Sequence, residues 1–122
     1  MADAVQLERT LLRGIGAITA ATGLLQAAAP QATLGPLKAD DSPTVRHFFG
    51  TVGMFMACTG GILVARSEDP PVVLMTAAQK LGASVAVGLG VRRGLLSPLA
   101  LGVAGFDALS GLLALDYWRR LS

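Results

Sequence analysis

Two side chains of opposite charge, Lys80 and Asp107, each lie near the middle of a long apolar segment. The chain between them turns near Gly94, so that Lys80 lies 13 residues before Arg93 and Asp107 lies 14 residues after it. At about 1.5 Å per residue, a helical hairpin brings two such positions to almost the same depth. The spacing therefore predicts an ion pair between neighbouring antiparallel helices.

An unpaired Lys or Asp at the centre of a membrane helix costs about 2.5–3.5 kcal/mol, and a counter-charge offsets part of this cost. Hydroxyl groups lie on the same helix faces, because Thr76 and Ser84 are each four residues from Lys80 and Ser110 is three residues after Asp107. These five residues form the predicted site. Two roles remain open for it: a structural pin that fixes the helix register, or a proton relay or ligand site.

The elements that must position this site are four apolar segments. A helix needs about 20 mostly apolar residues to cross a bilayer. We predict helices at about 8–29, 44–66, 70–92 and 97–118. Short loops make successive helices antiparallel, so we predict an all-α, polytopic integral membrane protein in which residues 1–122 form one antiparallel four-transmembrane-helix bundle.

Three of the predicted helices begin at a capping residue followed by proline, at Ser42-Pro43, Asp69-Pro70 and Ser97-Pro98. A side-chain oxygen at the N-cap and a proline at the first helical position both favour a helix start. The first segment has a second interpretation, because Arg9 and Arg13 precede an apolar run, as in a cleaved signal peptide. We favour a retained helix.

Composition supports a membrane location. Only 15% of the residues are charged and 52% are hydrophobic, whereas a soluble domain carries about 25% charged residues. The 15 glycines favour close helix packing through stripes of small residues. Three such stripes are predicted: Ala100, Ala104, Asp107, Gly111 and Ala114; Ala78, Gly82, Ala86 and Gly90; and Gly53, Ala57 and Gly61.

The helix ends carry residues suited to the membrane surface. Arg46 and His47 begin the second helix, and Tyr117 and Trp118 end the fourth. We predict these four as interfacial residues, since aromatic and basic side chains gather at headgroup depth. Five arginines on the side of the termini against four basic residues on the other side favour both termini in the cytoplasm.

Several functions are disfavoured by the residues that the chain contains. One histidine and one cysteine with no ligand spacing predict no metal site. The sequence contains no serine–histidine–acid set and no pair of acids that would predict a catalytic centre, and no cofactor is identifiable. The basic residues form short clusters instead of a basic face, so no nucleic-acid partner is expected. The expected partners are the lipid bilayer and either a second copy of the chain or a membrane subunit.

The segments RHFFGTVGMFMACTGGILVAR (46–66) and AAQKLGASVAVGLGV (77–91) give the chain a glycine-rich helical texture, with Arg46 before one helix and Lys80 within the next. In this it resembles the small DoxX-like membrane proteins over most of its length. The resemblance implies a four-helix bundle and, for some members, a link to quinone-dependent oxidoreductases; it assigns no catalytic residue. Small multidrug transporters place an acid within their first apolar helix, whereas Glu8 precedes the apolar run at about 11–29 here, which argues against them.

The function we expect is a non-enzymatic helical module that binds lipid, quinone or a partner protein, with Lys80 and Asp107 holding the bundle. The alternatives are a small proton-coupled transporter that uses the same pair, and an accessory membrane subunit of a redox enzyme.

Overall fold

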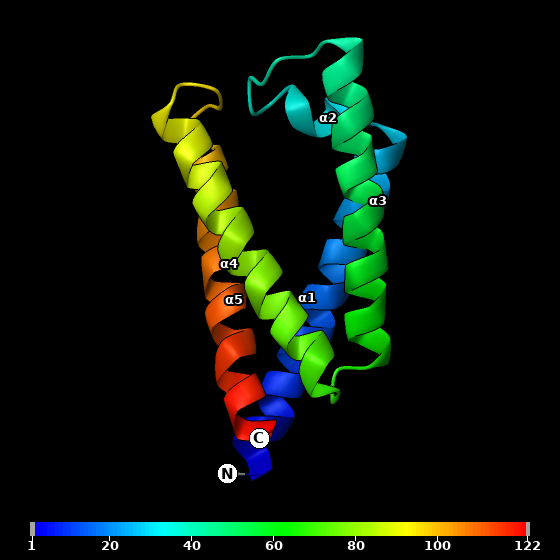
Figure 1. The fold of residues 1–122 in the computed structure, drawn as a ribbon, viewed down its shortest axis with the longest axis vertical. Coiled ribbons are helices and arrows are strands. Elements are labelled where there is room, and N and C mark those ends of the chain that lie inside the picture. The colour runs from blue at the N-terminus through cyan, green and yellow to red at the C-terminus, as the bar shows by residue number, and fades with distance from the viewer. Residues whose placement is uncertain (1, 122) are drawn as a thin grey trace.

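The computed structural model describes residues 2–121, so the first and last residues of the predicted domain 1–122 lie outside the described residues. The chain is all-helical in this range, as predicted, and four of its helices are long and apolar enough to cross a membrane. Figure 1 shows the five helices: α1 (Ala2–Ala28), the short α2 (Gln31–Leu34), α3 (Pro43–Ala65), α4 (Pro70–Arg92) and α5 (Ala100–Leu121). The main differences from prediction are that α1 begins at Ala2 and that α5 begins three residues later, at Ala100. Glu8 therefore lies within α1, where it is buried, whereas the contrast with small multidrug transporters predicted it before the first apolar helix.

The three predicted caps differ in the structure. The Ser42 hydroxyl accepts a hydrogen bond from the backbone N–H of Val45 at 3.2 Å, which is the expected N-cap. Asp69 makes no such bond, and its carboxylate lies 3.3 Å from Nη2 of Arg66. The Ser97 hydroxyl donates to the carbonyl of Pro36 at 3.3 Å, and a turn at residues 98–99 precedes α5.

Helices α1 and α3 form an antiparallel pair whose backbones touch. Gly16 lies opposite Gly60 and Gly23 lies opposite Gly53, so that a Cβ atom on Gly16 would lie only 2.8 Å from the Gly60 carbonyl oxygen. The predicted stripe on α3 is wrong at Gly61, which has no atom within 4 Å of a built Cβ. Seven residues return a helix to within about 20° of the same face, whereas eight overshoot by about 80°. Gly60, not Gly61, therefore continues the face of Gly53.

Helices α4 and α5 form the second antiparallel pair. The predicted small face of α5 is its buried face: Ala100, Ala104, Asp107, Gly111 and Ala114 are all buried. A Cβ atom on Gly111 would lie 2.7 Å from Cγ of Leu81 in α4. On α4 the other predicted stripe faces away from the rest of the chain, since three of its members are exposed: Ala78, Gly82 and Ala86.

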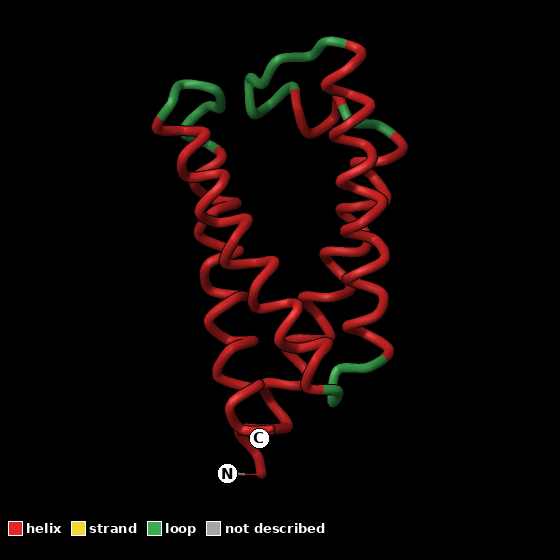
Figure 2. The backbone as a smooth tube through the Cα atoms, viewed as in Figure 1, coloured by secondary structure: helices red, strands yellow, loops and turns green. Residues whose placement is uncertain are grey.

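The two pairs meet near the end of the molecule that holds both termini and the α3–α4 connection, and they diverge toward the other end (Figures 1 and 2). A core of five buried residues marks the meeting point: Leu12, Val73, Ala77, Ala114 and Tyr117. At the far end the two connecting loops contact each other, because the backbone N–H of Ser97 donates to the carbonyl of Leu37 at 2.8 Å. The helices are thus arranged as two packed pairs rather than as an evenly packed bundle.

Candidate functional site

The structure brings Lys80 and Asp107 together. Nζ of Lys80 lies 3.4 Å from Oδ1 of Asp107, and the two residues are only 7% and 8% exposed. This juxtaposition follows from the α4–α5 hairpin, in which the two positions lie at matching heights on adjacent helices. The buried ammonium and carboxylate stabilise each other, because an unpaired charge in a low-dielectric interior is costly.

The shorter bond of Lys80 leads to a third helix. Nζ donates to Oγ1 of Thr19 in α1 at 2.7 Å, and Thr19 is itself buried. Lys80 therefore links the α4–α5 pair to α1. Thr19 is not among the predicted site residues. The available signal was that Thr19 is one of the few polar side chains in the middle of its apolar segment.

Two of the three predicted hydroxyls hydrogen-bond to backbone carbonyls and not to the pair. Thr76 donates to the carbonyl of Val72 in its own helix at 3.1 Å. Ser84 donates to the carbonyl of Ala104 at 2.9 Å, so it fastens α4 to α5 one turn away from Lys80. Ser110 is buried on the packed face of α5. The hydroxyl contact to the ammonium thus comes from Thr19 and not from Thr76, Ser84 or Ser110.

A cavity of about 330 Å³ adjoins the ion pair between the two helix pairs. Its walls come from α1, α3, α4 and α5, and its lining is Ile18, Thr19, Thr22, Met56, Lys80, Gly102, Val103, Phe106 and Asp107. The Phe106 ring lies 5.6 Å from Nζ of Lys80, within the range of a cation–π contact. The lining is thus apolar except for an ammonium, a carboxylate and two hydroxyls, which is the usual chemistry of a small-molecule site.

The paired charges limit what this cavity can do. A net-neutral pair attracts neither cations nor anions strongly, but the ammonium protons and the threonine hydroxyls can hydrogen-bond a polar group of an apolar ligand. The described lining contains no histidine, cysteine or serine that could act as a nucleophile beside a base. The arrangement supports binding of such a ligand.

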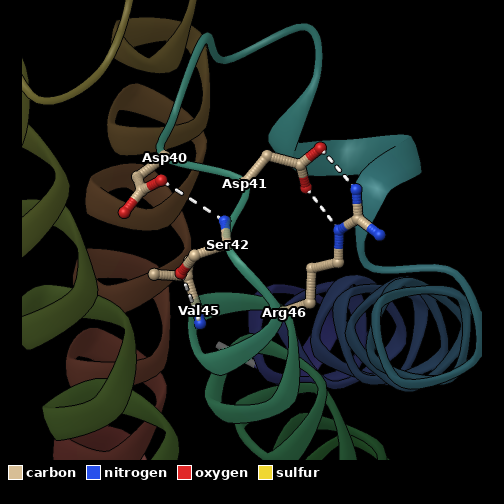
Figure 3. Close-up of polar contacts among 5 residues, drawn as sticks. All are labelled: Asp40, Asp41, Ser42, Val45 and Arg46. Atoms are coloured by element: carbon tan, nitrogen blue, oxygen red, sulfur yellow. Dashed lines mark hydrogen bonds and ion pairs between the residues drawn. The ribbon is translucent and has the colours of Figure 1, made fainter.

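The predicted interfacial residues Arg46 and His47 are exposed near the start of α3. Arg46 donates from Nε and Nη2 to the two carboxylate oxygens of Asp41 at 2.6 and 2.7 Å, as Figure 3 shows. This bidentate contact lowers the pKa of Asp41 below its ordinary value. Asp40 accepts a hydrogen bond from the backbone N–H of Ser42 at 3.3 Å, which orders the same loop (Figure 3).

At the end of α5, the structure turns Tyr117 inward. Its side chain is fully buried in the core, and its hydroxyl accepts a hydrogen bond from Nε of Arg9 at 2.9 Å. Trp118 packs partly buried against the same core. Nearby, Arg120 lies 2.8 Å from Glu8 and 3.0 Å from Asp116. Tyr117 therefore joins α1 to α5 at the level where we predicted an outward-facing aromatic anchor.

No family model, characterised protein or solved structure matches the chain. The resemblance to DoxX-like proteins accordingly stays a prediction.

Proposed function

We propose that the protein is embedded in a membrane through its four long helices. Large apolar side chains are exposed on all of them; Leu24, Phe48, Val85 and Leu109, one from each helix, are 62–71% exposed. Burial of apolar surface away from water is the main favourable term in folding, and a bilayer covers such surfaces. The helices also satisfy their backbone hydrogen bonds internally, as hydrocarbon requires.

Within the membrane, the function we propose is non-enzymatic binding of a small apolar ligand, a lipid or a quinone, in the cavity at Lys80. One observation carries this proposal: a cavity of about 330 Å³ between the helix pairs has a buried ion pair on an otherwise mostly apolar wall. A volume of this size accommodates a ring or the head of an amphiphile. The ammonium and Thr22 are the polar groups available to orient it.

Mass spectrometry of small molecules that co-purify with the protein in mild detergent tests this proposal. We expect one lipid or quinone per chain to depend on this cavity. Its amount should fall when Val103 is replaced by Trp, because the larger ring fills the cavity. The matched control is Leu109→Trp, at a strongly exposed position of α5 outside the cavity lining. Equal ligand content in both variants would contradict the proposal.

In this proposal Lys80 and Asp107 also pin the helices, since the pair and Thr19 connect α1, α4 and α5. The structural role requires that Lys80→Met combined with Asp107→Leu restores a fold that either single change damages.

A proton-coupled carrier is the second candidate, and a specific observation favours it. The ion pair lies on the cavity wall, between two helix pairs that share their packed core near one end of the molecule. Relative motion of the pairs would change the surroundings of Asp107. Reconstitution of the Lys80→Met, Asp107→Leu protein into vesicles separates the candidates: loss of pH-dependent uptake in an intact protein supports the carrier.

A further inference from the structure

A second hollow, of about 630 Å³, lies between the end of α1 and the first turns of α3. It shares no lining residue with the cavity at Lys80. Arg46 and His47 line one part of it, and Ala27, Gly50 and Met54 line another. The hollow thus combines the N–H donors of a guanidinium and an imidazole with an apolar wall.

The basic part and the apolar part of the hollow are separated along the axis of α3. Arg46 and Met54 are eight residues apart, or about 12 Å along a helix. The basic end lies within the first turn after Ser42 caps the helix, and the apolar end lies toward its middle. If α3 crosses a bilayer, as proposed above, the basic end is at headgroup depth and Met54 is in the hydrocarbon.

Asp41 holds the Arg46 side chain in place, yet the guanidinium can still donate further hydrogen bonds. Its bonds to Asp41 engage Nε and Nη2, so Nη1 is left to donate, and the side chain is 45% exposed. His47 is exposed on the next residue and carries a ring N–H in either tautomer. A phosphate oxygen is a preferred partner of a guanidinium. Asp41 competes for the same guanidinium, and Figure 3 shows the two side chains joined.

We propose that this hollow binds one phospholipid, with its phosphate against Arg46 and His47 and an acyl chain along Gly50 and Met54. Charge complementarity selects the phosphate, and the apolar wall selects a lipid over a soluble anion. This proposal rests on membrane insertion but not on the ligand of the Lys80 cavity. The Val103→Trp variant should therefore bind phospholipid as the unaltered protein does.

Native mass spectrometry in mild detergent tests it with three probes: phosphatidylglycerol, a diacylglycerol with the same chains, and inorganic phosphate. We expect one tightly bound phosphatidylglycerol, weak binding of diacylglycerol, and no competition by millimolar phosphate. Arg46→Gln combined with His47→Gln should weaken phosphatidylglycerol binding at least about tenfold, the scale of a lost charge-assisted contact. Arg93→Gln is the matched control, because Arg93 is exposed at the same end of the molecule but does not line the hollow.

Asp41→Asn distinguishes lipid binding from a purely structural use of Arg46. If the Arg46–Asp41 pair only fastens the loop, Asp41→Asn and Arg46→Gln should have the same effect. If Arg46 binds phosphate, Asp41→Asn should strengthen phosphatidylglycerol binding several-fold, since it removes the competing carboxylate. Both altered residues are exposed and both variants should fold, which the fluorescence of Trp118 checks. Unchanged binding in the double glutamine variant, parallel effects of the two single changes, or equal binding of diacylglycerol would overturn the proposal.

Discussion

At the scale of single residues, the molecule depends on one buried ammonium with two partners. Asp107 could be inferred from the sequence because it lies on the same hairpin as Lys80, where counting residues gives the relative height. Thr19 could not, since it is 61 residues from Lys80 and its position depends on how the two helix pairs meet. Sequence spacing within a hairpin is thus informative, whereas contacts between hairpins are not encoded in any local pattern.

Lys80→Met alone and Asp107→Leu alone should each lower the free energy of unfolding by about 3–5 kcal/mol, because each leaves a buried charge without its partner. The double variant should recover most of this loss. Thermal or denaturant unfolding in detergent, followed by the fluorescence of Trp118, the single tryptophan, measures all three. A double variant as unstable as the worse single variant would argue against the pair as a pin.

Thr19→Val should lower the free energy of unfolding by about 1–3 kcal/mol, because it keeps the shape of the side chain but removes the acceptor of the shorter Lys80 bond. Thr22→Val is the matched control. Thr22 lines the same cavity one turn away but is exposed, so its replacement should have little effect on stability. The same unfolding assay compares the two; equal losses would mean that the Thr19 bond contributes nothing specific.

At the scale of helices, packing depends on where glycines fall. The buried face of α5 could be predicted because its small residues recur at steps of four and three, which follow the helical repeat. The predicted stripe on α3 is wrong at Gly61 because successive steps of four residues drift around the helix. The exposed stripe on α4 shows a further limit, since a small face indicates that close packing is feasible but not that a partner is present.

Gly16→Ala should destabilise the protein by about 1–3 kcal/mol, since the added methyl group meets the Gly60 backbone at 2.8 Å and neither helix can yield locally. Gly14→Ala is a control in the same helix, because nothing lies within 4 Å of the added atom. That change should be neutral or stabilise by up to about 1 kcal/mol, through the better helix propensity of alanine. Unfolding midpoints of the two variants check the contrast, and a similar loss in both would contradict glycine-mediated packing of α1 on α3.

At the scale of the whole molecule, the arrangement into two pairs was not predictable from the sequence. Apolar length, proline positions and hairpin spacing determine the number and approximate bounds of the helices. They do not determine whether neighbouring hairpins pack along their full length, because exposed apolar side chains pack about as favourably against lipid as against another helix. The position of the Lys80 cavity therefore had to come from the structure.

The structure also bears on the membrane orientation that we propose. Both termini and the α3–α4 connection lie at the same end (Figure 1), the side on which the sequence predicts five arginines. By the positive-inside rule we expect this end in the cytoplasm. Reporter fusions at each terminus and in the α4–α5 loop measure the orientation. Activity of an exported reporter at either terminus would show the opposite arrangement.

The contact between Ser97 and the segment Pro36–Leu37 has a mechanical consequence. It consists of two hydrogen bonds, which together contribute about 1–3 kcal/mol, whereas the opposite end of the molecule is fastened by a packed core. Rocking of one hairpin relative to the other must therefore pivot about the core near Tyr117. We therefore expect the two loops to separate more readily than the helices do at the core end of the molecule.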